Sequence, residues 1–335
     1  MIDRLRSDRR GQLLLVGAVA LAIIILGLSV VVNTILFTEN VGTGEARVES
    51  PAIQEFSFES QKGVRSLLLR LNYDDQRNSM PELNETIRKQ VHNYSNAMAR
   101  SYASDGTVFV DVSYNDTLRN GTRIVQGTDR KFTYPASHAP GLGSNQLDWS
   151  PVADQTSIGW MVFNLDLRNT SGNQATVTVA NGTDTLTYRF NRSSRGSGGK
   201  LQVEVENSVT GGTDTTSCVS VGGRVLLDGR AGEAFLGECS FTGINAIEGP
   251  YTVTIRDGHN LAGQYDFIVD ERWNPSTTRT IDASVGGTDR QYTHCPAGGE
   301  APCLAPVVWK GQIDLIYRSS DVDYATTSNI TVYDP

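Results

Sequence analysis

The longest apolar run in the chain lies between Gly11 and Thr38. It reads GQLLLVGAVALAIIILGLSVVVNTILFT and contains no charged residue. A helix that crosses the roughly 30 Å hydrocarbon core of a bilayer needs about 20 apolar residues. Such a helix satisfies its own backbone hydrogen bonds, which lipid cannot do. We therefore predict one membrane-spanning helix over residues 12–38.

The charges on either side of this run predict its orientation. Four arginines lie within the first ten residues, whereas the segment 39–49 carries three glutamates and one arginine. Positively charged flanks stay on the cytoplasmic side of a membrane. Residues 1–11 are therefore expected in the cytoplasm and the chain after residue 38 outside the cell.

Two segments that follow have apolar residues at helical spacing. The first begins at Pro51 after Ser50, and the second begins at Ser79, so each has a residue typical of a helix start. Both stripes fit a single helical face. We predict that the two helices form a hairpin near the membrane, within residues 39–104. The apolar positions are Ile53, Phe56, Val64, Leu67, Leu68 and Leu71, then Leu83, Ile87, Val91, Tyr94, Met98 and Tyr102.

From Thr107 the apolar period changes to two, which is typical of half-buried strands. The Asn120-Gly121 and Asn181-Gly182 pairs predict tight turns between strands. Residues 135–155 contain three prolines and no period, which marks a possible break between two subdomains. The predicted strands lie at 108–114, 158–167, 175–179, 186–190, 201–205, 251–255, 265–269, 313–317 and 330–332.

Together these patterns predict an α+β protein. Its parts are a cytoplasmic leader (1–11), a transmembrane helix (12–38), a helical stalk or hairpin (39–104) and a mainly antiparallel, β-sandwich-like extracellular domain (105–335). Many short strands with glycine-rich turns favour the sandwich.

Charge and composition exclude some partners. The net charge is −8, and no basic cluster lies in the predicted outer region, so nucleic acid is not expected to bind. Arginine outnumbers lysine and aspartate outnumbers glutamate, beside abundant threonine, serine and glycine. This bias resembles that of surface proteins of salt-loving archaea.

All four cysteines lie in the predicted outer region, where an oxidising environment favours disulfides. Three pairings are open, and the shortest loops would join Cys218 to Cys239 and Cys295 to Cys303. A zinc site that uses His294, Cys295 and Cys303 is the alternative, but it lacks a fourth ligand and a typical spacing. No metal is therefore expected.

The outer region also contains eight Asn-x-Ser/Thr triplets without proline at the middle position, each an acceptor motif for N-glycosylation. Their asparagines are Asn84, Asn93, Asn115, Asn120, Asn169, Asn181, Asn191 and Asn329.

Catalytic motifs are absent from the sequence. No histidine falls in His-Glu-x-x-His, no Gly-x-Ser-x-Gly occurs, and no glycine cluster matches a phosphate loop with its Lys-Ser/Thr. Asp257-Gly258-His259 is expected to be a turn with a solvated histidine. The pairs Asp74-Asp75 and Asp321/Asp323 lack the ligand spacing of a calcium loop. We expect no catalytic residue and no cofactor.

Aromatic side chains on a β-domain offer one possible binding chemistry. Exposed tryptophans could stack on sugars, although tryptophan is more often a core residue. The four tryptophans are Trp149, Trp160, Trp273 and Trp309.

The residues before the apolar run, Arg9-Arg10-Gly11-Gln12-Leu13-Leu14, resemble the class III leader of archaeal type IV pilins. The resemblance implies that a prepilin peptidase cuts between Gly11 and Gln12, and that the apolar helix stays on the mature subunit and packs against other subunits. Two alternatives stay open for this segment: a permanent signal anchor and a cleaved secretory signal.

The sequence therefore predicts a non-enzymatic, pilin-like cell-surface subunit, either a minor or accessory pilin or an adhesin. The alternative is a monomeric, membrane-anchored extracellular module that binds a carbohydrate or a protein. An anchored extracellular enzyme is a third hypothesis, for which the sequence offers little support.

Overall fold

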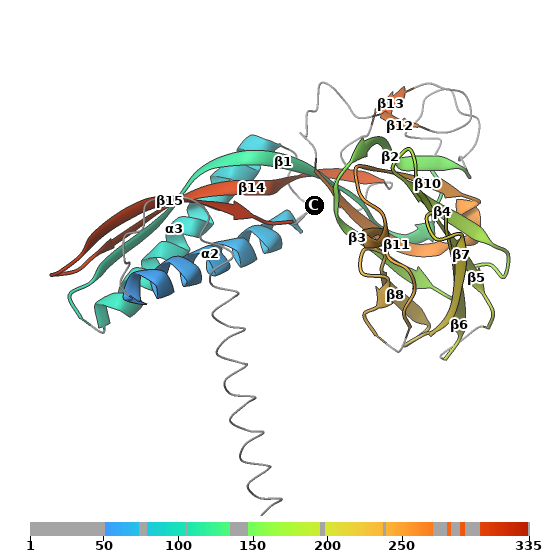
Figure 1. Ribbon diagram of the computed structural model, residues 1–335, viewed down its shortest axis with the longest axis horizontal. Helices are drawn as coiled ribbons and strands as arrows, with labels where there is room; N and C mark the ends of the chain where they lie inside the picture. The colour runs from blue at the N-terminus through green and yellow to red at the C-terminus, as the bar shows by residue number, and fades with distance from the viewer. Residues whose placement is uncertain are drawn as a thin grey trace, which may run out of the picture. The chain divides into compact units, whose positions relative to one another are not determined.

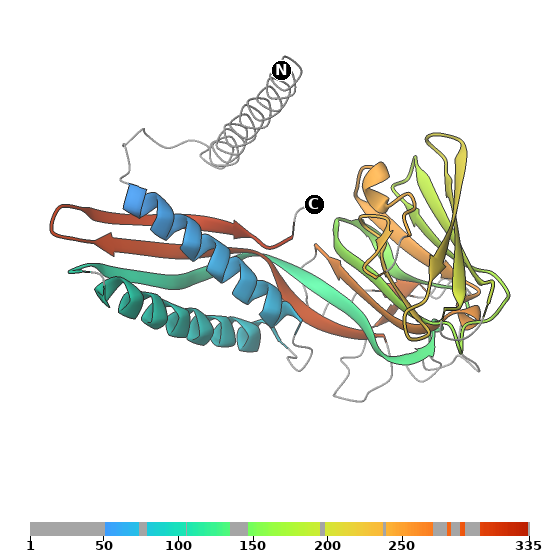
Figure 2. The ribbon, with the colours of Figure 1, turned by 90° about the horizontal axis from the view of Figure 1, so that it is seen from below.

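Two amphipathic helices lie side by side on one face of an antiparallel sheet in the computed structural model (Figures 1 and 2). They are α2 (Pro51–Asn72) and α3 (Met80–Ser104). The helices run antiparallel, because the start of α2 contacts the end of α3. The Phe56 and Tyr102 ring centroids lie 5.8 Å apart, and the Tyr94 hydroxyl donates to the Glu59 carbonyl at 3.0 Å. The structure describes residues 51–73, 79–104, 106–134, 147–194, 198–236, 239–270, 280–282, 289–291 and 302–333.

The helical stripes predicted from the sequence are confirmed. The backbone N–H of Glu82 donates to the Ser79 hydroxyl at 3.4 Å, so Ser79 caps α3 as expected. Burial of the stripes against the sheet, and not helix propensity alone, stabilises both helices. The buried apolar residues are Ile53, Phe56, Val64, Leu68 and Leu71 of α2, and Leu83, Ile87, Val91 and Met98 of α3.

The strands form two sheets in which every paired strand is antiparallel. One sheet has seven strands in the order β15-β14-β1-β11-β3-β8-β9, and the other has eight in the order β13-β12-β2-β10-β4-β5-β6-β7. The strands are β1 (Phe109–Lys131), β2 (Trp149–Thr156), β3 (Ile158–Asp166), β4 (Ala175–Ala180), β5 (Thr185–Arg192), β6 (Lys200–Asn207), β7 (Gly212–Val219), β8 (Arg224–Asp228), β9 (Glu233–Ala234), β10 (Tyr251–Arg256), β11 (Ala262–Val269), β12 (Thr280–Asp282), β13 (Asp289–Gln291), β14 (Cys303–Arg318) and β15 (Asp323–Thr331). Two short 3-10 helices, η2 (Ile244–Ala246) and η3 (Gly258–Asn260), lie between strands.

Two hydrophobic cores share the long strands β1 and β14. The first core lies between the two sheets and contains residues such as Phe163, Val203 and Phe267. The second lies between the helices and the β15-β14-β1 part of the seven-stranded sheet, around Leu68 and Leu315. Figure 2 shows β1 and β14 continuing from beneath the helices into the sandwich. Ala52–Pro335 form one compact unit.

The predicted α+β class with an N-terminal transmembrane helix is wrong as a description of this fold. The chain is mostly β, with about half of the described residues in strands. No helix within the described ranges is long and apolar enough to cross a membrane. Residues 12–38, for which we predicted the span, lie outside the described residues. The β-sandwich part of the prediction is compatible with the two packed sheets.

The segment 135–155 was a candidate for a break between subdomains. Phe132 and Tyr134 before it and Trp149 and Val152 inside it are all buried in the sandwich core. The passage from one core to the other occurs instead within β1 and β14. The helices therefore pack on residues of the first strand, β1, and of the last two strands, β14 and β15.

The Asn181-Gly182 hairpin is confirmed, whereas the predicted Asn120-Gly121 turn is wrong. Asn181 lies between β4 and β5, and its Oδ1 accepts from the backbone N–H of Asp184 at 2.7 Å. Asn120 and Gly121 lie inside β1, where they pair with Val308 and Val307 of β14. The register shifts next to Asn120, as at a β-bulge.

Gly121 is needed at this position for close packing and not for a turn. A Cβ atom there would lie 2.6 Å from the carbonyl oxygen of Val269 and 2.9 Å from a methyl of Val307. Glycine inside a strand often marks such a close backbone approach. Packing between non-neighbouring residues therefore overrides the local turn signal.

We expect Gly121→Ala to lower the free energy of unfolding by about 1–3 kcal/mol, because an added methyl in a packed site forces the backbone to shift. Denaturant unfolding measures this change. Gly106→Ala is the matched control, since a Cβ at Gly106 meets nothing within 4 Å. Equal stability of the two variants would contradict the packing role of Gly121.

Candidate functional site

The structure confirms one predicted disulfide, between Cys218 at the end of β7 and Cys239. Both cysteines are buried, at 0% and 8% exposure. Cys303, at the start of β14, is also disulfide-bonded. Cys295 lies outside the described residues, as does the predicted processing junction at Gly11 and Gln12. Among the described residues, no group of three or more His, Cys, Asp or Glu side chains could hold a metal.

The eight glycosylation motifs differ in exposure, and none of their asparagines is buried. In the half-buried group, the side chains of Asn84 and Asn181 make hydrogen bonds. For example, the Asn181 amide donates to the Glu248 carbonyl at 2.8 Å. The exposed asparagines are Asn93, Asn115, Asn169 and Asn329, and the half-buried ones are Asn84, Asn120, Asn181 and Asn191.

The histidines and acidic pairs form no catalytic arrangement among the described residues. Asp257 adopts a left-handed conformation (φ 52°) and leads into η3, so the predicted turn is present. His259 in η3 is half-buried, and its Nδ1 has no hydrogen-bond partner. Asp323 pairs with Arg318 at the surface. Asp74, Asp75, His138 and His294 lie outside the described residues.

Trp160 is the only one of the four tryptophans that both lies in a described part of the chain and is partly exposed. Trp149 and Trp309 are buried, at 0% and 2% exposure, which agrees with a core role. Trp273 lies outside the described residues. Trp160 lies on β3 and points to the side of the seven-stranded sheet opposite the sandwich core.

Trp160 lines a cavity of about 350 Å³ that we call the sheet-face groove. Strands place side chains on alternate faces. Met161, Phe163 and Leu165 of β3 therefore enter the core. The residues between them face the groove, together with those of β1, β8 and β11. The lining is Tyr73, Arg123, Val125, Gln126, Gly127, Trp160, Val162, Asn164, Leu226, Phe235, Gln264, Tyr265 and Asp266.

Three aromatic rings form a continuous row in the groove. The Tyr73 and Trp160 centroids lie 5.8 Å apart with nearly perpendicular planes. The Trp160 and Phe235 centroids lie 6.2 Å apart. Phe235 is 45% exposed, so this row presents apolar surface to solvent. Rings so arranged provide a rigid apolar platform with little conformational freedom to lose.

A nearly buried ion pair fixes one side of the row. Nη2 of Arg123 lies 2.8 Å from Oδ2 of Asp266, and Nε lies 2.9 Å from Oδ1. Nη1 of Arg123 donates to the Tyr73 carbonyl at 2.7 Å, and the guanidinium lies 5.1 Å from the Tyr73 ring centroid. Burial, with the nearby Tyr333 and Asp266, raises the pKa of Tyr73. Its hydroxyl therefore stays protonated and can donate a hydrogen bond.

Planar amides also line the groove. Asn164 of β3 and Gln264 of β11 are cross-strand partners, and Nδ2 of Asn164 donates to Oε1 of Gln264 at 3.3 Å. Gln126 is held differently, because its Nε2 donates to the Arg130 and Gly263 carbonyls. Aromatic rings, planar amides and a charged pair together form a lining typical of small-molecule sites.

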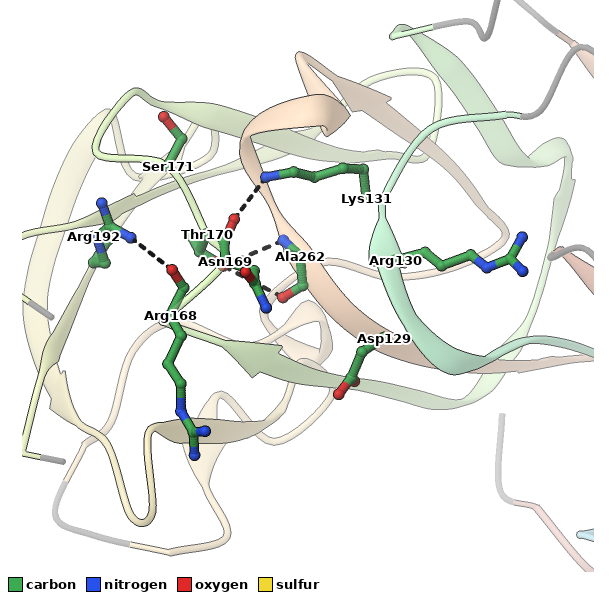
Figure 3. Close-up of a pocket in the computed structure, with 9 residues that line it drawn as sticks. All are labelled: Asp129, Arg130, Lys131, Arg168, Asn169, Thr170, Ser171, Arg192 and Ala262. Carbon is green, nitrogen blue, oxygen red and sulfur yellow. Dashed lines mark hydrogen bonds between the residues drawn. The ribbon is translucent and has the colours of Figure 1, made fainter. Parts of the chain in front are cut away.

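A second cavity of about 490 Å³, the basic pocket, lies at the ends of β1, β3 and β5. Figure 3 shows Lys131 and Arg192 reaching the loop 168–171 from two sides. Nζ of Lys131 donates to the Asn169 carbonyl at 2.6 Å. Burial and the Arg192 charge lower the pKa of Lys131. Its lining is Asp129, Arg130, Lys131, Arg168, Asn169, Thr170, Ser171, Arg192 and Ala262.

Trp160 was predicted only as one of four tryptophans that could stack on sugars, and the rest of the groove was not predicted. Asp266 lies between the buried Tyr265 and Phe267 of β11, and a charge at that position was an available signal. The pairing of Asp266 with Arg123 was not predictable, because the two are separated by 143 residues. Asn164 and Gln264 likewise meet only through strand pairing.

Residues 7–140 match a family of unknown function (DUF7261). The match includes the apolar N-terminal run, both helices and all of β1. No curated protein and no solved structure matches the chain. The description of the family assigns no activity to the groove or to the basic pocket.

We expect Arg123→Met to lower the free energy of unfolding by about 3–5 kcal/mol, because it leaves the Asp266 charge in a nearly buried site. Arg189→Met is the matched control. Arg189 pairs with Glu204 and Glu206 on the surface, where an ion pair contributes only about 0–1 kcal/mol. Denaturant unfolding compares the two variants, and equal losses would contradict the structural role of the Arg123–Asp266 pair.

Proposed function

We propose that this chain is a non-enzymatic cell-surface protein that binds a carbohydrate through the sheet-face groove. The observation that supports this proposal is that the row of Tyr73, Trp160 and Phe235 and the amides of Asn164 and Gln264 line one cavity. A sugar ring has apolar C–H faces that pack on aromatic rings. Its hydroxyl groups both donate and accept, as planar amides also do. The groove offers both chemistries within one cavity.

The groove favours binding over catalysis. Its carboxylate, Asp266, is engaged by Arg123 at 2.8–3.1 Å and so cannot act freely as a general base. No histidine, cysteine or serine is among the groove residues. A general acid or base must be within hydrogen-bond reach of the reacting group, and this lining provides no such pair.

An extracellular location accords with the covalent chemistry of the chain. The Cys218–Cys239 disulfide favours an oxidising compartment. The four exposed Asn-x-Ser/Thr motifs would be glycosylated only on a secreted or surface protein. An adhesin or an anchored binding module would place the groove where it meets carbohydrate of other cells or of the surroundings.

Trp160→Ala is expected to weaken carbohydrate binding at least tenfold, because it removes the central ring of the row. A ring contact of this kind contributes about 0.5–1.5 kcal/mol beyond its buried area, and each 1.4 kcal/mol changes affinity tenfold. Glycan-array screening of the full-length chain identifies a binding saccharide, and titration calorimetry then compares the variants.

Phe109→Ala is the control for this experiment. Phe109 is 53% exposed at the start of β1 and does not line the groove, so binding is expected to stay unchanged. A screen in which no saccharide binds would contradict the proposed function. Equal loss of binding in both variants would show that the effect is not specific to the groove.

The second candidate function is that of a pilin-like subunit, either a minor or an accessory pilin. The observation that favours it is the sequence Arg9-Arg10-Gly11-Gln12 directly before the apolar run. In this proposal a prepilin peptidase removes residues 1–11, and the apolar segment joins other pilin-like subunits at the cell membrane. The two candidates are compatible, because a filament can carry an adhesive subunit.

The pilin-like proposal predicts that the mature protein from native cells begins at Gln12. Gly11→Val should block the cut, because the peptidase would act directly after Gly11. Intact-mass measurement and N-terminal sequencing report both results. A native chain that begins at Met1 would favour a permanent anchor, and one that begins after Thr38 would contradict assembly through the apolar segment.

A further inference from the structure

We propose that the Cys218–Cys239 disulfide positions one wall of the sheet-face groove and thereby sets the affinity of the groove for carbohydrate. This inference rests on the proposed carbohydrate binding. It assigns a role in binding to a bond that lies in the sandwich core, between two cysteines that are not among the groove residues.

The wall consists of β8 and β9 with Phe235, at the edge of the seven-stranded sheet. β9 is the last strand in the order of that sheet, and β8 is its neighbour. The wall contributes Leu226 of β8 and Phe235, which directly follows β9, to the groove lining. Phe235 forms one end of the aromatic row through its contact with Trp160. A shift of this edge would therefore change the apolar surface that a sugar ring meets.

The hydrogen bonds between β8 and β9 hold this edge over a short distance only. β9 has two residues, and both of its cross-strand pairs are with β8. The Phe235 N–H adds one hydrogen bond, to the Leu226 carbonyl at 3.0 Å. The Phe235 side chain is too exposed for core packing to fix it, so its position depends on the backbone that carries it. A strand pair this short is at most marginally stable by itself.

The disulfide connects this weakly paired edge to the other sheet. Cys218 belongs to β7, the last strand in the order of the eight-stranded sheet. The Cys239 carbonyl accepts from the Ala234 N–H at 2.9 Å, so the residue next to Phe235 is bonded directly to a cysteine of the disulfide. The two cysteines are 21 residues apart in the chain, and the loop that they close contains both Leu226 and Phe235. The groove wall is therefore covalently tied to the core at its base.

A wall that is held in place before the ligand arrives favours affinity. Ordering a chain segment during association costs free energy, and a constraint already present in the free protein removes part of that cost. Without the disulfide, the hydrogen bond between Ala234 and Cys239 would join the wall to a segment that is no longer attached to β7. We therefore expect weaker binding and a less favourable binding entropy.

The test measures binding of saccharides to the full-length chain by titration calorimetry. The probes are cellotetraose, chitotetraose and mannotetraose. For a probe that the unmodified chain binds, Cys218→Ala/Cys239→Ala should lower the affinity about threefold or more, because the wall must then be ordered by the ligand. Val203→Ala is the matched control, since it shortens a side chain buried in the same core. It should lower the stability and leave the affinity unchanged.

Phe235→Ala distinguishes a positioning role from a general loss of stability. This variant should weaken binding by roughly tenfold, as expected for the loss of one aromatic contact. Removing the disulfide from Phe235→Ala should then cost less affinity than removing it from the unmodified chain, because the ring that it positions is already absent. Residues that act through one another give such non-additive effects.

Ala234→Pro tests the same connection with the disulfide intact. Proline has no backbone N–H, so this variant loses the hydrogen bond to the Cys239 carbonyl. Its affinity for the saccharide should fall in the same direction as that of the cysteine variant. This measurement decides the question if Cys218→Ala/Cys239→Ala does not fold.

Four outcomes would overturn the inference. Unchanged affinity in the cysteine variant and in Ala234→Pro would refute the positioning role and leave the proposed carbohydrate binding intact. An equal loss in Val203→Ala would attribute the effect to stability alone. An equal loss with and without the Phe235 ring would show that the disulfide does not act through this residue. Failure of every saccharide to bind the unmodified chain, among the probes and on the array, would refute the proposed function and this inference together.

Discussion

The structure depends on the passage of β1 and β14 from one hydrophobic core to the other. Where β14 changes core, Val308 pairs with Asn120 of β1 on one side. Its other edge has no paired strand, because the pairing with β15 begins at Lys310. The side-chain amide of Asn72, the last residue of α2, takes the place of a strand. Its Nδ2 donates to the Val308 carbonyl and its Oδ1 accepts from the Val308 N–H, both at 2.9 Å. A buried peptide group without such a partner would destabilise the fold, so the helical layer completes the sheet as well as covering it.

The same junction creates the sheet-face groove. Arg123 lies just inside β1 after the crossing, and its guanidinium joins the Asp266 carboxylate of β11 to the Tyr73 carbonyl directly after α2. Tyr73 thereby becomes one end of the aromatic row, although it belongs to the helical layer. The groove is a product of both cores. The hydrogen bonds of Arg123 satisfy polar groups where the two layers meet, and they also hold Tyr73 in the aromatic row.

Local patterns in the sequence predicted the elements better than their arrangement. The stripes from Ile53 to Leu71 and from Leu83 to Tyr102 fixed both helices, and the alternation at Met161, Phe163 and Leu165 fixed a strand with its buried face. Local signals could not show that Asn120-Gly121 lies inside a strand, since that follows from the close approach of Val269 and Val307. They offered all four tryptophans as possible sugar-stacking residues and did not single out Trp160. They could not assemble the groove, because Tyr73, Trp160 and Phe235 come from segments far apart in the chain.

The two cavities lie at different places on the seven-stranded sheet. A sheet alternates its side chains, so one face of β3 supplies the core residue Phe163 and the other supplies Trp160 and Asn164 to the groove. At the end of the strand the backbone turns at Asp166, whose carboxylate accepts from the Arg168 N–H at 3.0 Å and from the Asn169 amide at 2.8 Å. That turn presents a fixed loop to Lys131 and Arg192. Aromatic packing along the strands and a fixed loop at their ends are therefore two consequences of one sheet.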